Sequence, residues 1–430
     1  MATSVRYFEP EVEPNPVCKL ALVGFGTVGS AVARLLHARR DEHELQLTHI
    51  CNRSVARKKV DWMPDHVAWT DDIEDVLASD ADVVVELVGG LNPAHDWVRR
   101  ALESGKSVVT ANKQLIAHYA SDLIDLAFDN GQTLAFGASV AGGVPVLAGL
   151  QEGLGGDRLF QVSGILNGTC NYILTRIEGT GTSFADALRE AQEKGFAEAD
   201  PTDDIDGYDA RAKLVILARV GLQAAVNPAD VHCGTIRKIA SVDFEYAHDL
   251  GCTIRQVSRA EKRGGLLYAA VEPALVKLDS PLASISGSQN LVVSTGEFGG
   301  ETVFSGHGAG GNPTAVAVVS DLLQIARRRA QSLHVRDSET MDVSADFETM
   351  HYVRFVVKDR PGIIAALAAT FSTHHINIDA VLQQRGHSKS ELPFVITLEA
   401  CAKSRLQQAL DEMKQLEFLL QEPVTMPILG

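Results

Sequence analysis

Three successive patterns along the 430-residue sequence predict an α/β protein with three domains. Apolar runs alternate with helical segments over 17–138, which predicts a doubly wound parallel sheet. Glycine-rich joints over 139–340 separate strand-like runs from helical runs and predict an α+β domain. The pattern over 350–430 has the βαββαβ order of a small ferredoxin-like domain. Residues 1–16 are expected to form an N-terminal arm outside these domains.

The composition is that of an ordinary soluble globular protein and opposes several kinds of partner. Hydrophobic residues make up 45% and charged residues 22% of the chain. The net charge of -16 and the pI of 5.3 oppose nucleic acid or an anionic membrane surface as the main partner. The six cysteines form no CxxC pair, so neither a zinc site nor a disulfide framework is expected. Because there is no signal-peptide pattern and no apolar run near the roughly 20 residues that span a bilayer, we expect a cytoplasmic protein.

The start of the parallel sheet carries a glycine-rich loop. The apolar run CKLALVGFG is followed by TVGSAVARLLHARR, whose apolar spacing is helical, so the motif GFGTVG lies between a strand and a helix. Its glycines allow a tight turn, and the helix N-terminus offers N–H groups to a pyrophosphate. This context predicts a Rossmann-type dinucleotide-binding domain. Its expected cofactor contacts are Gly24, Phe25, Gly26, Thr27, Val28 and Gly29.

The segment after the second expected strand, CNRSVARKK, bears on the choice of cofactor. An acidic residue roughly 20 positions beyond the glycine motif usually binds the ribose 2′-hydroxyl of NAD. Asn52 and Arg53 stand in this region instead, with Arg57, Lys58 and Lys59 close by. Arg53 is therefore expected to accommodate a 2′-phosphate, which favours NADP and leaves NAD as the second choice. The alternative is an exposed basic helix start without a cofactor role.

A group of charged residues lies in the middle domain. In EKGFAEADPTDDIDGYDARAKLVILARV, an acidic loop precedes a helix whose run LVILA is apolar on all sides, which is typical of burial. Asp209 and Lys213 are four residues apart and therefore share one face near the start of that helix. Burial and the helix dipole lower the pKa of a lysine in this position, whereas the carboxylate raises it. Such a lysine can act as an acid or a base; a surface ion pair is the alternative.

Several motifs together resemble one enzyme family. TANK, AGGVP, GILNGTCNYIL and the acidic stretch occur in the order typical of homoserine dehydrogenases, and the resemblance extends from Cys18 to Gln331. It implies reversible hydride transfer between L-homoserine and L-aspartate 4-semialdehyde, a step in threonine, methionine and isoleucine biosynthesis. The cofactor would carry the hydride chemistry, and the protein would orient the reactants and manage one proton. A homodimer or homotetramer is the expected assembly.

The resemblance also implies roles for individual residues. Lys213 would donate or accept the proton at the substrate oxygen. Glu198 and Asp209 would hold the amino group or hydroxyl of the substrate, since an ammonium group needs several acceptors. Asp204 lies in the same acidic loop and would support them. Lys113 of TANK follows a predicted strand end, where open α/β sheets bind ligands, and would lie at the cofactor and the substrate.

Two glycine-rich segments extend the resemblance, one of them with a departure. GHGAGGNPT resembles a segment that lines the cofactor, which implies backbone contacts from Gly308 and Gly310; a plain loop is the alternative. FGASVAGGVP resembles a segment in which a glutamate and backbone carbonyls bind a monovalent cation such as Na+, but Gly137 replaces the glutamate. Loss of an anionic ligand is expected to weaken such a site. Its remaining ligands would be the carbonyl oxygens of Val140, Gly142 and Val144.

The C-terminal segment YVRFVVKDRPGIIAALAATFSTHHINIDAVLQQ resembles an ACT domain. ACT domains often bind small amino acids, which implies feedback regulation by threonine, an end product of homoserine metabolism. The resemblance places effector contacts at Asp359 and Gly362, beside Pro361 in the turn after the first strand, and at Asn377 before the second strand. The alternative is a domain that only holds subunits together.

Two other functions are compatible with parts of the sequence. A semialdehyde dehydrogenase would use Cys170 as a nucleophile, but no histidine motif that could activate a thiol accompanies it. A sensor without catalytic activity would bind the dinucleotide and an amino acid only. The joint presence of Lys113, Glu198, Asp209 and Lys213 favours the dehydrogenase over both.

Overall fold

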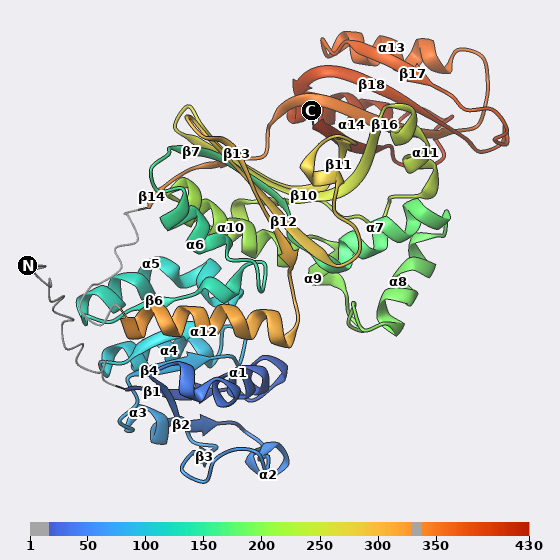
Figure 1. Cartoon of the computed structure of the whole chain (residues 1–430). Helices are drawn as coiled ribbons and strands as arrows, with labels where there is room; N and C mark the ends of the chain where they lie inside the picture. The colour runs from blue at the N-terminus through green and yellow to red at the C-terminus, as the bar shows by residue number, and fades with distance from the viewer. Residues whose placement is uncertain (1–16, 328–337, 430) are drawn as a thin grey trace, which may run out of the picture.

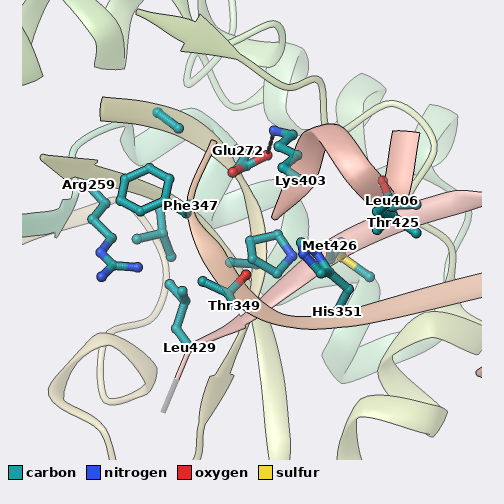
Figure 2. Close-up of a pocket in the computed structure, with 14 residues that line it drawn as sticks. Arg259, Glu272, Phe347, Thr349, His351, Lys403, Leu406, Thr425, Met426 and Leu429 are labelled. Atoms are coloured by element: carbon teal, nitrogen blue, oxygen red, sulfur yellow. Dashed lines mark hydrogen bonds and ion pairs between the residues drawn. The ribbon is translucent and has the colours of Figure 1, made fainter. Parts of the chain in front are cut away.

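The computed structural model describes residues 17–327 and 338–429, and its first part is a parallel sheet (Figure 1). The six strands are β1 (Cys18–Val23), β2 (Leu45–Cys51), β3 (Ala68–Thr70), β4 (Val83–Glu86), β5 (Ser107–Thr110) and β6 (Leu134–Ala135). They are ordered β3-β2-β1-β4-β5-β6, so the chain moves outward from β1 and then returns to place β4 on its other side. This order confirms the expected doubly wound sheet and creates a switch point between β1 and β4.

Helices cover both faces of the parallel sheet. Val84 of β4 packs with one set of helices, whereas Val83 and Val85 pack with another, because alternate side chains of a strand point to opposite faces. All of β4 is buried, which explains why three valines in a row precede its last residue, Glu86. The helices of this part are α1 (Thr27–Ala38), α2 (Val55–Lys58), α3 (Ile73–Leu77), α4 (Ala94–Glu103) and α5 (Lys113–Asp129), with a short 3-10 helix η1 (Arg40–Glu42).

A helix from much later in the chain completes one of these layers. In the structure α12 (Gly311–Arg327) lies along α1, and its Val318 and Leu322 share one buried cluster with Val32 and Leu36 (Figure 1). This packing carries the glycines before α12 to the edge of the parallel sheet.

The middle of the chain forms a second, antiparallel sheet. Its main strands are β7 (Leu159–Ile165), β10 (Cys252–Arg263), β11 (Leu266–Lys277), β12 (Gln289–Gly296) and β13 (Gly300–His307). They are ordered β13-β12-β7-β10-β11. The α+β class expected for this region is confirmed.

Helices and short elements pack around this second sheet. The longest are α7 (Gly168–Thr180), α8 (Phe184–Glu193), α10 (Tyr208–Leu222) and α11 (Ser241–Asp249). Of these, α10 is packed against β7 and β10 and is mostly buried, as its apolar run predicts. The shorter elements are η2 (Gly137–Ser139), α6 (Val146–Ala148), η3 (Gly149–Gly153), α9 (Thr202–Ile205), β8 (Ala224–Ala225), η4 (Pro228–Asp230), β9 (His232–Cys233) and η5 (Pro281–Ala283).

The C-terminal part has the expected βαββαβ order. Its elements are β16 (Glu348–Val357), α13 (Ile363–Thr373), β17 (Ile378–Leu382), β18 (Leu392–Ala402), α14 (Lys403–Met413) and β19 (Val424–Leu429). The strands are ordered β19-β16-β18-β17, with antiparallel neighbours, which is the ferredoxin-like arrangement.

The C-terminal part is joined to the middle of the chain in two ways that the sequence did not predict. First, β19 pairs with β11 in parallel, so one sheet runs through both parts (Figure 1). Second, Arg354 of β16 binds Asp243 of α11, with 2.7 Å between Nε and Oδ1, and the hydroxyl of Tyr352 donates to the same oxygen at 2.8 Å. Asp243 and Tyr352 are both fully buried.

The stretch 338–348, between the middle and C-terminal parts, contains two short strands. β14 (Glu339–Thr340) pairs with β8, and β15 (Val343–Ser344) pairs with β11. The expected arm over 1–16 lies outside the described residues. Among the described helices, none is long and apolar enough to cross a membrane.

Candidate active site

A buried ion pair at the start of α10 forms the centre of the candidate site. Lys213 Nζ lies 2.8 Å from Asp209 Oδ2 and donates a second hydrogen bond, at 2.7 Å, to the carbonyl oxygen of Leu166. The side chains of Lys213 and Asp209 are only 12% and 10% exposed. The structure thus brings the two residues together below the surface, and the alternative of an ordinary surface ion pair is wrong.

A second lysine reaches the same carboxylate from the parallel sheet. Lys113 is the first residue of α5, and its Nζ lies 2.9 Å from Asp209 Oδ1. The neighbouring Asn112 caps α5 by accepting from Leu115 N. Because β5 ends at Thr110 beside the end of β4, Lys113 stands at the carboxyl edge of the sheet, where such sheets bind ligands.

Each charged group of this cluster stabilises the charged form of its partner. Burial raises the pKa of the Asp209 carboxyl, but the two lysines and the hydrogen bonds from Lys213 and Asn167 outweigh it, so the pKa lies well below its usual range. The Asp209 charge raises the pKa of Lys113, against the opposing effect of burial. Asp209 is therefore an anion, and Lys113 a cation, at neutral pH.

Asn167, which the sequence analysis did not single out, links Asp204 to this cluster. Its side-chain amide donates to Asp204 Oδ1 at 2.6 Å and to Asp209 Oδ2 at 2.8 Å. Burial raises the pKa of Asp204, while the hydrogen bond from Asn167 opposes the rise. Its position in GILNGTCNYIL, before a helical run, is a helix-cap signal that could have drawn attention to it.

Glu198 does not contact Asp204 or Asp209 in the structure. It is exposed in the segment between α8 and α9, and only its carbonyl oxygen is held, by Gln192 Nε2 at 3.0 Å. Within the described residues its carboxylate makes no hydrogen bond or ion pair.

The glycine motif forms a tight turn at the end of β1. Gly24 has a φ of 101°, and a Cβ there would lie 2.8 Å from Leu87 O; a Cβ at Gly29 would lie 2.1 Å from Gly24 O. Gly26 has open space where its Cβ would be, which leaves room for a ligand. Phe25 N donates to Asn52 Oδ1 at 3.3 Å, and Thr27 and Val28 begin α1. These residues fit a dinucleotide phosphate.

The N-termini of α1 and α12 lie side by side at this turn. A Cβ at Gly311, the first residue of α12, would lie 3.1 Å from the carbonyl oxygen of Thr27. Gly310 precedes it with a φ of 123°, and a Cβ at Gly308 would collide with the buried amide of Asn290. Two helix N-termini thus converge where negative phosphate charge is favoured.

Arg53 lies exposed in the turn between β2 and α2. Within the described residues it forms no ion pair. The neighbouring Asn52 contacts the glycine loop, since its Oδ1 accepts a hydrogen bond from Phe25 N. The guanidinium is thus free to meet a ligand at the end of β2.

A carboxyl group lies beside the loop that was expected to bind a cation. Asp321 of α12 accepts a hydrogen bond from Gly137 N at 2.8 Å, and a Cβ at Gly137 would lie 2.6 Å from its Oδ1. Burial raises the pKa of Asp321 to about 7, although the backbone N–H groups of Gly137 and Ala138 oppose the rise. This carboxyl group is therefore divided between its neutral and charged forms near neutral pH, and the weakened cation site expected at this loop stays a prediction.

The candidate effector residues lie at opposite ends of the ACT sheet. Gly362 is the N-cap of α13, with a φ of 94°. It lies near Asp359, whose backbone N–H donates to the carbonyl oxygen of Lys389 at 2.8 Å. Asn377 donates to Glu399 Oε2 at 3.0 Å, beside the other end of β16. The fold of one chain does not bring Asn377 to the other two residues.

Cys170 is poorly suited to nucleophilic attack. Its side chain is fully buried in α7, and its thiol donates to the carbonyl oxygen of Asp204 at 3.1 Å. Burial raises the pKa of the thiol well above its usual value. The thiolate form is thus disfavoured.

A glycine loop at the switch point of a doubly wound sheet, together with Lys113 and Lys213 around a buried carboxylate, is the architecture of a nicotinamide-dependent dehydrogenase. Three family models match the chain: "Homoserine dehydrogenase, NAD binding domain" over 24–137, "Homoserine dehydrogenase" over 145–323 and "ACT domain" over 351–418. The chain belongs to the homoserine dehydrogenase family, and both resemblances found in the sequence are confirmed.

Relatives match over nearly the full length of the chain. The homoserine dehydrogenase of Mycobacterium tuberculosis is 38% identical over 93% of this chain and 94% of its own. That of Synechocystis is 35% identical over 96% and 99%. Among solved structures, a homoserine dehydrogenase from Thiobacillus denitrificans has a TM-score of 0.89 at 29% identity, over 96% of this chain and 98% of that chain. One from S. aureus has a TM-score of 0.78 at 30% identity, over 96% and 99%.

Proposed function

We propose that the chain catalyses the reversible, NADP-dependent interconversion of L-homoserine and L-aspartate 4-semialdehyde. The observation that carries the proposal is the binding of Asp209 by Lys213 of α10 and Lys113 of α5, at the carboxyl edge of the parallel sheet. The nicotinamide ring, when bound, supplies or accepts the hydride. The residues of the chain bind the substrate, orient it and move the proton at its oxygen.

Lys213 is the residue that moves this proton. A protonated lysine has three N–H donors, and two of those of Lys213 are directed to Leu166 O and Asp209 Oδ2. The third is left for the substrate oxygen. During reduction Lys213 gives its proton to that oxygen, and during oxidation the neutral amine removes the hydroxyl proton.

The substrate is an amino acid and brings both charges of a zwitterion. Lys113 stands where it can meet an oxygen of the substrate while Asp209 balances its charge. Asp204 and Glu198 are acceptors for the ammonium group, and Glu198 has no competing partner among the described residues. Glu198 is exposed, so its side chain can turn toward a bound substrate without breaking an existing contact.

The choice of NADP rests on Arg53. An exposed guanidinium at the end of β2, in the region where an acid would bind the ribose of NAD, suits a 2′-phosphate. A related archaeal homoserine dehydrogenase, with a TM-score of 0.63 and 28% identity over 74% of this chain, has been solved in complex with NADPH. The glycine loop and the N-termini of α1 and α12 would hold the pyrophosphate.

The second part of the proposal is feedback regulation by an amino acid that binds the ACT domain. We infer that threonine binds between two copies of the chain, contacting Asp359 and Gly362 of one copy and Asn377 of the other. This arrangement follows from their separation within one chain and is compatible with a homodimer or homotetramer. Threonine lowers activity only if it binds the less active state more tightly.

A direct assay tests the proposed reaction. NADPH oxidation is followed with L-aspartate 4-semialdehyde as substrate, and the reverse reaction with L-homoserine and NADP. We expect turnover in both directions. A folded sample that binds NADPH but turns over neither substrate would favour the sensor without catalytic activity.

A further inference from the structure

Asn167 uses both N–H donors of its side-chain amide, and its amide oxygen, inside the candidate site. It follows β7, is 4% exposed and caps α7, since its Oδ1 accepts from Cys170 N at 2.8 Å. Its Nδ2 donates to Asp204 Oδ1 at 2.6 Å and to Asp209 Oδ2 at 2.8 Å. The N–H of Cys170 fixes which end of the amide is the oxygen. The two hydrogens therefore point at the two carboxylates.

The contact with Asp209 differs in kind from the two lysine contacts. Asp209 Oδ2 accepts from Lys213 and from Asn167, whereas Oδ1 is bound by Lys113. When Lys213 gives up its proton, its attraction for Asp209 falls, but the amide is neutral and keeps its hydrogen bond. Asn167 is thus the contact on Oδ2 whose charge stays constant through the reaction.

The amide also separates two like charges. Asp204 and Asp209 each accept one hydrogen from the same Nδ2 atom, and the Asp209 charge contributes to the raised pKa of Asp204. A group with two N–H donors and no charge is suited to this position, since an additional anion would repel both carboxylates.

We propose that Asn167 is a positioning residue for proton transfer: its side-chain amide fixes the Asp209 carboxylate against Lys213 in both protonation states. The proposal rests on the proposed function, because it presupposes that Lys213 moves the proton. It adds a residue of the NGTCNYIL motif to the machinery of that reaction.

Two substitutions separate this role from the capping of α7. Asn167→Asp keeps the shape and a capping oxygen but replaces the N–H donors with a carboxylate oxygen. Asn167→Ser also keeps a capping group and is too short to bridge both carboxylates. Asn171→Ser, one turn further along α7, is the matched control, because Asn171 Nδ2 is directed to Gly287 O and away from the carboxylates.

The readout is the pH profile of kcat for homoserine oxidation, together with KM and the Kd for NADPH. In Asn167→Asp the added negative charge favours the protonated lysine, so the rising limb of the profile is expected to move upward by about one pH unit. In Asn167→Ser we expect kcat to fall about 10²-fold through misplacement of Asp209. Neither variant should change the Kd for NADPH, and Asn171→Ser should keep the normal profile.

The outcomes separate this inference from the proposed function. If Lys213→Ala is inactive while the Asn167 variants keep the wild-type kcat and profile, the positioning role is wrong and the proposed function stands. If Lys213→Ala keeps its activity, the proposed proton transfer itself fails. Should Asn167→Asp not fold, Asn167→Ser decides alone, and a kcat within twofold of wild type overturns the inference.

Discussion

Lys113 and Asp209 form an ion pair of 2.9 Å between the start of α5 and the start of α10. The pair joins the parallel sheet to the helix that carries Lys213, so it ties the cofactor side of the site to the substrate side. Replacing Lys113 by Met should lower kcat/KM about 10²-fold, because both charge balance and orientation are lost. Lys277→Met, at the exposed end of β11, is the control and should have normal kinetics. Near-normal kcat/KM in Lys113→Met would contradict this role.

Under the proposed function, Arg53 should set the preference between the two nicotinamide cofactors. Because only NADP has a 2′-phosphate, Arg53→Ala should raise KM for NADPH about tenfold, as expected for loss of a charge-assisted contact of about 1.4 kcal/mol. KM for NADH serves as the internal control and should stay unchanged. Equal changes with both cofactors would show that Arg53 does not contact the 2′-phosphate.

The ion pair between Asp243 and Arg354 should be essential for attachment of the ACT domain. Both side chains are buried, so Asp243→Asn leaves a charge without its partner, which costs about 3–5 kcal/mol. We expect a clearly lower Tm in thermal unfolding. Glu422→Gln removes the exposed partner of Lys238 on the same side of the interface and should leave the Tm unchanged. An unchanged Tm in Asp243→Asn would contradict the assignment.

Asp321 should make stability depend on pH in an unusual direction. Its pKa is about 7 in the folded chain, above the ordinary value of 3.8, so the unfolded chain loses this proton first. Its contribution to stability is therefore complete below about pH 4, declines as the pH rises to about 7 and stays low above that. The Tm of Asp321→Asn, measured from pH 5 to pH 8.5, should fall less than that of the wild type. Parallel curves would disprove the raised pKa.

Cys170 should be dispensable for catalysis. Its thiol is buried and its pKa is raised, so it cannot supply a reactive thiolate at neutral pH. Cys170→Ser is expected to keep kcat within a few-fold of wild type. Complete loss of activity, with normal Tm and NADPH binding, would restore the thiol mechanism.

The sequence predicted what depends on local patterns. GFGTVG lies between a strand and a helix, as its flanks indicate, and the spacing of Asp209 and Lys213 places them on one helical face. The sequence did not predict contacts between distant segments. Asp321 meets Gly137 across 184 positions, and Asn167 meets Asp209 across 42, because packing of whole elements, and no local spacing, sets these distances.

The lack of a local signal for long-range contacts also explains why the middle domain and the ACT domain were expected to be separate. Their patterns are each complete, and nothing in the apolar run around Val424 reveals that β19 will pair with β11 as well as β16. Alternation of apolar and polar residues indicates which face of a strand is covered, not which of its edges are paired. The run up to Leu429 therefore cannot distinguish a central strand from an edge strand.

Lys213→Ala tests the central claim most directly. Steady-state NADPH oxidation with L-aspartate 4-semialdehyde should show a kcat reduced at least 10²-fold, the lower end of what general acid–base catalysis contributes, with the Kd for NADPH little changed. A kcat near that of the wild type would contradict the assignment of proton transfer to Lys213.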